Sequence, residues 1–293
     1  MNSRYHLTDV FAEAPYAGNQ LATFLDAAAI DGAEMQRIAR AFNFAETTFV
    51  TGGSLEAGYD VRIFTPAAEL PFAGHPILGT AHLLREVRHP DADSVTLNVG
   101  VGPIPVRFVD GAAWMEQNPC RYGPELDRGD AARALGLDAH EVDAVLPVQE
   151  VSTGLATVVI PLGGLASLRR IDPDNSAIRT FLQSAEAAKN VLVVCREPYE
   201  PHQQVAARMF ASELGISEDP ATGSANGAFA GYALAQGFAS DDGTVRLAVG
   251  QGYEIARPST LYLEASGQGE SMRILVGGRV NTVAVGDWLP LQT

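Results

Sequence analysis

The chain has 293 residues, of which 46% are hydrophobic and 19% charged, values of a folded globular protein that exclude a disordered chain. No apolar run approaches the roughly 20 residues of a membrane span, so no membrane partner is expected. The formal net charge of −15 would repel a phosphate backbone, and without a cluster of Lys and Arg no nucleic-acid partner is expected either.

The cysteines and the N-terminus indicate the cellular compartment. Only two cysteines occur, Cys120 and Cys195. They are too few for a disulfide framework or a Cys-rich metal site, and we expect both to be small buried residues. The first residues contain neither the apolar segment nor the small-residue cleavage site of a secretory signal peptide. A cytoplasmic location is therefore the expectation.

The first half is predicted to contain mostly strands and one surface helix. Partial alternation and enrichment in Val, Thr and aromatic residues predict strands over residues 5–11, 47–51, 59–65, 95–99 and 105–109. Asp31 with Glu34 three residues later forms a capping-box pattern that predicts a helix over residues 31–43. One face of this helix is apolar and consists of Met35, Ile38, Ala39 and Phe42.

Two further segments have the composition of buried helices. Residues 77–84 are mostly apolar, and residues 225–235 carry Gly, Ala, Phe, Tyr and Leu around most of the helical circumference. A helix that is apolar on most sides is a buried helix. The predicted fold class is therefore α+β, with each half wrapping a twisted, mostly antiparallel sheet around one central buried helix.

The sequence repeats itself about half a chain later. The motif E-x-P-x-x-G-[HS] occurs at residues 69–75 and 218–224, after Arg-x-Phe at 62–64 and 208–210, while V-x-L-x-V-G-x-G occurs at 95–102 and 245–252, and Leu-Ala-Thr at 21–23 and 155–157. Matches in the same order predict a duplicated fold of two pseudo-symmetric halves. We place the boundary near Tyr122, in a turn-rich stretch. The halves are then residues 1–122 and 123–293, with the final strand a candidate to pack back on the first half.

The repeated motif places a glycine at the start of each central helix, Gly74 and Gly223. A helix N-terminus presents free backbone N–H groups and the positive end of the peptide dipoles, which favour an anion. If the halves pack around a pseudo-two-fold axis, both helix starts face one cleft and hold a carboxylate from two sides. The alternative is that both are merely Gly-rich helix caps.

The two turns differ chemically. His75 in the first corresponds to Ser224 in the second, and Leu70 corresponds to Asp219. A symmetric structural cap has no need of this difference, so His75 and Asp219 are candidates for handling protons. Taken alone, each has a structural alternative, because His75 is also suited to capping a helix and Asp is a frequent N-cap residue.

Two residues outside the turns are further candidates. Glu46 stands between apolar and aromatic neighbours at the junction of the predicted helix and strand, where desolvation should raise its pKa towards neutrality. A solvated glutamate at a strand edge is an equally acceptable interpretation. Asn19, after Gly18, either offers an amide to a ligand or forms a turn.

The motifs also resemble one family in order along nearly the whole chain. Ala17-Gly18-Asn19, residues 46–50, 62–66, 69–76 and 218–225, and Gln251-Gly252 through Arg257-Pro258-Ser259 resemble the phenazine-biosynthesis PhzF-like isomerases. The resemblance implies a diaminopimelate-epimerase-like fold, a cofactor-free site between the halves and a homodimer.

The resemblance also implies the chemistry. Glu46 would move a proton between carbons of a small carboxylate, as in trans-2,3-dihydro-3-hydroxyanthranilate isomerase. His75, Asp219 and Ser224 would hold the polar groups of the substrate, and Gly74 and Gly223 would offer backbone N–H groups. Ala45 departs from the serine expected before the glutamate. The two catalytic cysteines of the amino-acid epimerases with this fold are absent at the turns.

Two other functions are compatible with these residues. Ser224, His75 and Asp219 have the residue types of a hydrolase triad, although no G-x-S-x-G elbow occurs. A non-enzymatic protein that binds small carboxylates is the second alternative. No metal site is expected, since the spacing of His75, His82 and His89 matches no zinc motif. Neither a nicotinamide motif nor a suitable lysine is present, so no organic cofactor is expected.

Overall fold

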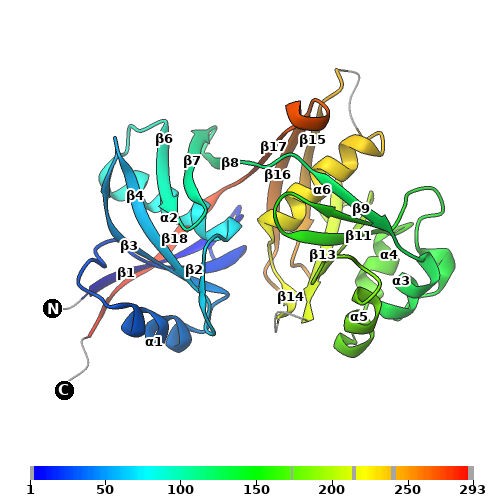
Figure 1. Cartoon of the computed structure of the whole chain (residues 1–293), viewed down its shortest axis with the longest axis horizontal. Coiled ribbons are helices and arrows are strands. Elements are labelled where there is room, and N and C mark those ends of the chain that lie inside the picture. Colours follow the sequence, from blue (N-terminus) through cyan, green and yellow to red (C-terminus); the bar gives the residue numbers. More distant parts are fainter. Residues whose placement is uncertain (1–2, 173, 213–215, 239–241, 290–293) are drawn as a thin grey trace. The chain divides into compact units, whose positions relative to one another are not determined.

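The computed structural model describes residues 3–172, 174–212, 216–238 and 242–289. The chain forms two compact units, the first made of residues 1–115 and 277–293 and the second of residues 116–276 (Figure 1). The chain thus crosses between the units at Met115 and Glu116 rather than near Tyr122. The crossing lies within a strand, β8 (Ala112–Gln117), which pairs with β7 (Gly102–Val109) of the first unit, and turn-forming residues therefore could not mark it.

The described residues of the first unit form mixed β-sheet and two helices. Its strands are β1 (Ser3–Val10), β2 (Asn19–Phe24), β3 (Glu46–Ser54), β4 (Gly58–Phe64), β5 (Glu69–Leu70), β6 (Ser94–Val99), β7 (Gly102–Val109), the first part of β8, and β18 (Val280–Trp288). Its helices are α1 (Gly32–Phe42) and α2 (Gly74–Arg88). β18 pairs antiparallel with β1 over the length of that strand, so the end of the chain belongs to this unit.

The second unit contains β9 (Arg121–Glu125), β10 (Gln149–Ser152), β11 (Ala156–Pro161), β12 (Val191–Cys195), β13 (Val205–Ala211), β14 (Ile216–Asp219), β15 (Val245–Gln251), β16 (Ser259–Ser266) and β17 (Arg273–Gly278). Its helices are α3 (Arg128–Ala134), α4 (Leu165–Arg170), α5 (Asn175–Leu182) and α6 (Gly223–Ala235), with short 3₁₀ turns at Ala139–Glu141 and Gly269–Ser271. β17 carries the chain back towards the first unit at Gly277.

The strands of the two units pair in the same pattern. In the first, β1–β2, β3–β4 and β6–β7 are antiparallel, whereas β2–β3 and β4–β6 are parallel. In the second, β10–β11, β12–β13 and β15–β16 are antiparallel, whereas β11–β12 and β13–β15 are parallel. A short strand, β5 or β14, pairs with β4 or β13 just before α2 or α6. The predicted duplication and the mostly antiparallel α+β architecture are therefore confirmed.

Helix α1 follows its sequence pattern closely. The Asp31 carboxylate accepts a hydrogen bond of 2.8 Å from the backbone N–H of Glu34, and Asn43 ends the helix in the left-handed conformation. The apolar face packs on a core of aromatic and aliphatic side chains that includes Phe24, Phe49 and Phe64. The predicted strands of the first half are also present, with ends that differ by a few residues.

Helices α2 and α6 are the buried centres of their units, as their composition predicts. Every residue of α2 from His75 to Ala81 is buried, and so is every residue of α6 from Ala225 to Ala233. Small residues let α6 lie close to its neighbours: a Cβ on Gly231 would stand 2.1 Å from the sulfur of Cys120. None of the described helices has both the length and the apolarity to cross a membrane.

An arginine–glutamate pair precedes each repeated turn. In the first unit Arg62 donates from Nε and Nη2 to Glu69, both at 2.7 Å. In the second Arg208 donates in the same two-pronged way to Glu218, at 2.9 and 2.7 Å. The first pair is partly exposed, whereas the side chains of the second are about 5% and 7% exposed. Each pair ties the strand before the turn to the turn itself.

Candidate active site

Glu46 and His75 lie together in the first unit. Glu46 is the first residue of β3, and His75 is the second residue of α2. Glu46 Oε2 lies 3.5 Å from His75 Nε2, and the two side chains are only 15% and 7% exposed. The interpretation of Glu46 as a solvated glutamate at a strand edge is therefore wrong. The parallel pairing of β2 with β3 sets this position by placing Glu46 beside Leu21.

The His75 ring is neutral. Burial lowers its pKa to about 3, against the opposing effect of a hydrogen bond to the Gln20 backbone. Nε2 is buried and makes no hydrogen bond within the described part of this unit, so the nitrogen that bonds Gln20 is Nδ1. A carbonyl only accepts, so Nδ1 carries the proton and Nε2 presents a lone pair. The lone pair on Nε2 can therefore accept a hydrogen bond from a donor placed beside it.

A chain of three buried hydroxyls holds the strand of Glu46 against the helix of His75. Thr23 on β2 bonds Thr48 on β3, and Thr48 bonds Thr80 on α2, both at 2.8 Å. Alternate residues of a strand share a face, so Thr48 lies on the same face of β3 as Glu46. These bonds fix the spacing between β3 and α2, and with it the spacing between Glu46 and His75.

The remaining candidates of the first unit lie beside this pair. Asn19 is buried at the start of β2, next to Gln20, whose carbonyl bonds the His75 ring. Gly74 is the first residue of α2, after the extended residue Ala73. The structure therefore gathers Asn19, Glu46, Gly74 and His75 where β2, β3 and α2 begin.

The second unit gathers Asp219, Gly223 and Ser224. Asp219 is buried at the end of β14, and its Oδ2 accepts a very short hydrogen bond from the Thr222 hydroxyl. Thr222, not Asp219, is the N-cap residue of α6. Gln117 donates from Nε2 to the Gly223 carbonyl at 3.1 Å. Ser224, second in α6, is half-buried.

The two central helices start without a side-chain cap. Asp31, Asp127 and Asp174 each accept a backbone N–H at the start of α1, α3 and α5. Ala73 and Thr222, the N-cap residues of α2 and α6, make no such side-chain bond. The first backbone N–H groups of these two helices therefore remain suited to an anion. That the two starts share one cleft stays a prediction.

Glu46 has no acidic counterpart in the second unit. The Leu-Ala-Thr match aligns Phe24 with Val158, which pairs with Val191 as Phe24 pairs with Phe49. Counting back three residues along each partner strand leads from Phe49 to Glu46 and from Val191 to Ala188, a buried residue. Only one half of the duplicated chain therefore carries a carboxylate at this place.

Four polar residues that support these groups are not among the candidates predicted from the sequence: Gln20, Thr222, Asn226 and Gln251. Gln20 acts through its backbone carbonyl, which no side-chain motif reveals. Thr222 lies inside the second repeated motif, and Gln251 replaces Val101 within V-x-L-x-V-G-x-G. A polar residue in a repeat position that is apolar in the other half was the available signal.

The cysteines and the other histidines lie outside both groups. Burial raises the pKa of the Cys195 thiol to about 11 and that of the half-buried Cys120 to about 12, so both thiols stay protonated near neutrality. His82 lies 3.9 Å from Glu86, and His89 bonds the Tyr59 hydroxyl. Among the described residues no three His, Cys, Asp or Glu side chains are grouped as metal ligands.

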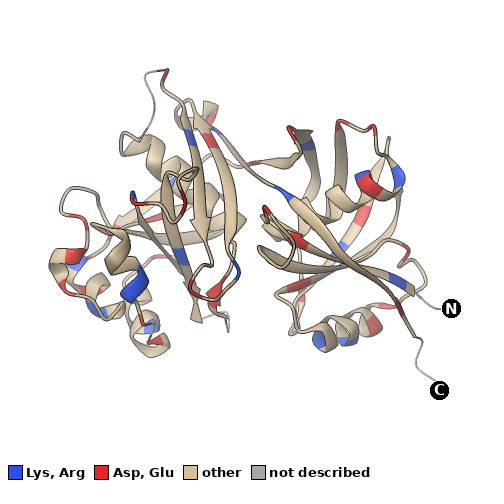
Figure 2. Cartoon of the chain, turned by 180° about the vertical axis from the view of Figure 1, so that it is seen from behind, with Lys and Arg blue, Asp and Glu red and all other residues tan. Residues whose placement is uncertain are grey.

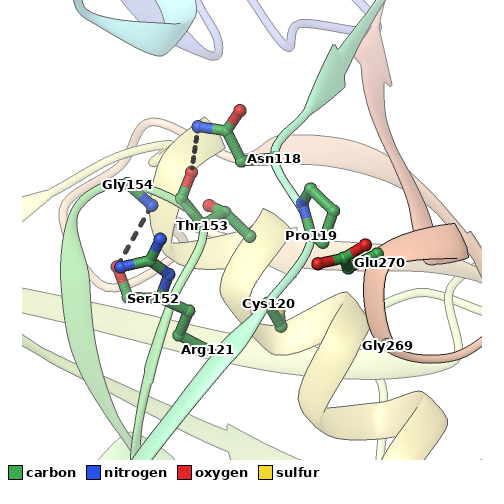
Figure 3. Close-up of a pocket in the computed structure, with 9 residues that line it drawn as sticks. All are labelled: Asn118, Pro119, Cys120, Arg121, Ser152, Thr153, Gly154, Gly269 and Glu270. Carbon is green, nitrogen blue, oxygen red and sulfur yellow. Dashed lines mark hydrogen bonds between the residues drawn. The ribbon is translucent and has the colours of Figure 1, made fainter.

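A separate hollow of about 740 Å³ lies in the second unit (Figure 3). Its lining consists of Asn118, Pro119, Cys120, Arg121, Ser152, Thr153, Gly154, Gly269 and Glu270, none of which is a candidate site residue. Lys and Arg residues are spread along the ribbons of both units (Figure 2).

Comparison with known proteins identifies relatives along nearly the whole chain. Residues 8–286 match the PhzC-PhzF family, described as phenazine biosynthesis-like protein. An uncharacterized isomerase from Mesorhizobium japonicum is 37% identical over 294 residues, which are 96% of this chain and 97% of that protein. Trans-2,3-dihydro-3-hydroxyanthranilate isomerase from Pseudomonas aeruginosa is 35% identical over 270 residues, 91% of this chain and 92% of that protein.

Solved structures support the same grouping. A PhzF-family phenazine biosynthesis protein from Bacillus anthracis superposes with a TM-score of 0.90 at 27% identity, over 99% of this chain and 100% of that one. A hydroxyproline epimerase from Agrobacterium vitis shares the fold alone, with a TM-score of 0.59 at 11% identity over 98% of this chain and 92% of that one. The predicted epimerase-like fold is thereby confirmed. Because the family match extends over residues 8–286, the chain belongs to the PhzC-PhzF family of phenazine biosynthesis-like proteins and is an isomerase.

Proposed function

We propose that this isomerase moves a proton between two carbons of a small carboxylate, without a cofactor, and that Glu46 carries the proton. The observation that carries the proposal is the buried Glu46–His75 pair, with its atoms 3.5 Å apart. A carboxylate and an imidazole held side by side away from solvent are typical of proton-transfer sites. The buried Ala188 at the matching place supports a mechanism with one carboxylate instead of two symmetric bases.

In the proposed reaction the Glu46 carboxylate removes a proton from a carbon near the substrate carboxylate. The electron pair of the broken C–H bond moves into the adjacent π-system and gives an enolate-like or extended conjugated anion. The protonated Glu46 then returns the proton to a different carbon, so the substrate gains and loses no atoms. The net result is an isomer with a shifted double bond.

The developing anion needs hydrogen-bond donors that are in place before the reaction. We propose that the uncapped starts of α2 and α6, at Gly74 and Gly223, face one cleft and supply backbone N–H groups. Asn19, Asp219 and Ser224 would orient the polar groups of the substrate. The neutral His75, with its lone pair on Nε2, would accept a hydrogen bond from a substrate N–H or O–H group, or from Glu46 when it is protonated.

The names of relatives suggest where to look for the substrate. The relative from P. aeruginosa is named for the isomerisation of trans-2,3-dihydro-3-hydroxyanthranilate. Ala45, just before Glu46, offers no hydroxyl to a substrate. We therefore propose a related small carboxylate, and a homodimer as the state in solution, which light scattering of the purified protein would test.

The experiment is proton exchange in deuterated water, followed by NMR. The dihydrohydroxyanthranilate and a panel of cyclic and acyclic 2-amino and 2-hydroxy carboxylates are incubated with the wild type, with Glu46→Gln and with Glu56→Gln. Glu56 is an exposed carboxylate on the turn after β3 and serves as the matched control. We expect Glu46→Gln to lower exchange about 100- to 10,000-fold, and Glu56→Gln to leave it unchanged.

Two results would contradict the proposal. Exchange at the wild-type rate in Glu46→Gln would remove Glu46 from the reaction. Covalent labelling of Ser224 by a serine-directed probe, together with hydrolysis of an ester substrate, would favour a hydrolase that uses Ser224 with His75 and Asp219.

A further inference from the structure

Two fully buried amide side chains lie behind Asp219. Asn226, in the first turns of α6, and Gln251, the last residue of β15, are both 0% exposed. Asn226 Nδ2 donates to Gln251 Oε1 at 2.8 Å. Gln251 Nε2 in turn donates to the Thr222 hydroxyl at 3.2 Å, and Thr222 donates to Asp219 Oδ2. The four side chains form one hydrogen-bonded chain that ends on the carboxylate.

Backbone carbonyls fix the direction of this chain. Asn226 Nδ2 also bonds the Thr222 carbonyl at 3.0 Å, and Gln251 Nε2 also bonds the Asp219 carbonyl at 2.8 Å. A carbonyl can only accept, so neither amide can be turned around without losing a bond. Because Gln251 donates to the Thr222 oxygen, the single hydroxyl proton of Thr222 is left to point at Asp219. The Oδ2 atom is therefore held as an acceptor.

We propose that Thr222, Gln251 and Asn226 are positioning residues that hold Asp219 as an oriented carboxylate at the start of α6. The inference rests on the proposed function, because it concerns the working state of a group assigned to the substrate. A hydrogen bond to the charged form of a carboxylate favours that form. The chain of donors therefore biases Asp219 towards accepting hydrogen bonds and away from donating them.

The duplicated half shows that the fold itself does not require this arrangement. In the first unit the residue that matches Gln251 is Val101, which is 60% exposed, and the residue that matches Asp219 is Leu70. The polar chain therefore occurs only in the half that carries the carboxylate. The nearest charged residues on β13 and β14, Arg208 and Glu218, bond each other rather than this chain.

Substitutions that keep shape but change proton direction test the inference. Gln251→Glu replaces the donating amide with a carboxyl, which draws the Thr222 hydroxyl proton away from Asp219. Thr222→Val removes the hydroxyl and keeps the shape, and since the Thr222 side chain makes no cap bond, α6 should still form. Thr222→Ser retains the hydroxyl and is the conservative variant.

Gln203→Glu is the matched control for placing a carboxyl in the interior of this unit. Gln203 is also buried, and its side chain hydrogen-bonds Tyr253, Thr260 and the backbone N–H of Glu200. Circular dichroism and urea unfolding establish that each variant folds. The readout is the pH dependence of kcat and of kcat/KM for the exchange reaction.

We expect Thr222→Val and Gln251→Glu to lower kcat by roughly 10- to 100-fold, the usual range for a lost hydrogen bond to a charged group. The acidic limb of their pH profiles should move to higher pH by about one unit, because Asp219 loses a bond that favours its ionised form. Thr222→Ser should stay within roughly threefold of wild type. Gln203→Glu should leave the acidic limb in place.

An unchanged acidic limb in a folded Thr222→Val variant would overturn the inference, and so would an equal loss of kcat in Gln203→Glu. Thr222→Val decides the question alone if Gln251→Glu does not fold. These outcomes are separate from the proposed function. If Glu46→Gln still exchanges at the wild-type rate, the proposed function fails. If Glu46→Gln is inactive but Thr222→Val and Gln251→Glu keep the wild-type pH profile, only the inference about the positioning residues fails.

Discussion

At the scale of single residues, the state of His75 is the feature with the most consequences. A histidine on a helix is ordinarily a group that titrates near neutrality. Here burial lowers its pKa to about 3, and the Gln20 carbonyl holds the proton on Nδ1. The ring therefore enters the site as a neutral acceptor beside Glu46, and a positive charge there is available only at strongly acidic pH.

Because His75 is buried in its neutral form, the stability of the protein should depend on pH. The unfolded chain has a histidine pKa near 6.5 and takes up a proton below that pH, whereas the folded state resists protonation until about pH 3. Stability should therefore fall as the pH is lowered between these values, by at most about 1.4 kcal/mol per pH unit from this residue. Urea unfolding of wild type and His75→Asn at pH 7.0, 5.5 and 4.5 measures the difference.

His75→Asn should lose less stability on acidification than the wild type, each compared with itself at pH 7.0. His202→Asn changes an exposed histidine and should follow the wild type. Parallel pH dependence of wild type and His75→Asn would show that His75 is not held neutral by the fold.

At the scale of elements, the duplication places the same arginine–glutamate contact in both units, partly exposed in the first and buried in the second. The turn before each central helix is tied to a strand by Arg62 and Glu69 in one unit and by Arg208 and Glu218 in the other. Arg208 is buried and also donates to the carbonyls of Leu168 and Ile171. The same pattern of contacts should therefore contribute very differently to stability.

Removing each arginine separately tests this. Arg208→Met leaves Glu218 buried without its cation and should cost about 3–5 kcal/mol of unfolding free energy. Arg62→Met breaks a partly exposed pair and should cost about 0–1 kcal/mol. Urea unfolding of both variants gives the comparison, and similar losses would mean that burial does not distinguish the two pairs.

Helix α6 gives a second prediction at this scale. Alanine normally favours a helix over glycine by about 1 kcal/mol, but a Cβ on Gly231 would collide with the Cys120 side chain. Gly231→Ala should therefore destabilise the protein by about 1–3 kcal/mol, the usual cost of overpacking. Gly129→Ala at the start of α3, where only side-chain ends are near, should cost less. Thermal unfolding of the two variants measures this, and a more stable Gly231→Ala would show that α6 has room to spare.

At the scale of the whole molecule, the two units differ in how the chain builds them. The second is continuous from residue 116 to 276 and has a large apolar core of its own. The first is completed only by β18, which pairs with β1 from Ser3 to Val10. We therefore expect folding of the first unit to require β18, and folding of the second to require nothing outside residues 116–276.

Separate expression of the parts tests this asymmetry. Residues 116–276 should unfold cooperatively in urea as an isolated protein. Residues 1–115 should lack a cooperative transition until a peptide of residues 277–293 is added, because the outer edge of β1 is otherwise unpaired. Circular dichroism during the titration follows the change. A cooperative transition of residues 1–115 without the peptide would show that β18 is dispensable.

Much of this protein is determined by its sequence alone. The cap and the apolar face of helix α1 are formed by residues close together in the chain, and the apolar composition of α2 and α6 predicts their burial. The duplication, the family motifs and the candidates Glu46, His75, Asp219 and Ser224 also follow from the order of residues along the chain. Such features depend on residues a few positions apart, so a sequence pattern can predict them.

Only the tertiary structure decided the rest. The approach of Glu46 to His75 depends on β3 and α2 packing across hydroxyls from three separate segments, and the neutral ring depends on a backbone carbonyl of β2. The support behind Asp219 comes from β15, and the end of the chain completes the first sheet. Each of these contacts joins residues far apart in the chain, and burial and proton direction arise only once such segments have been brought together.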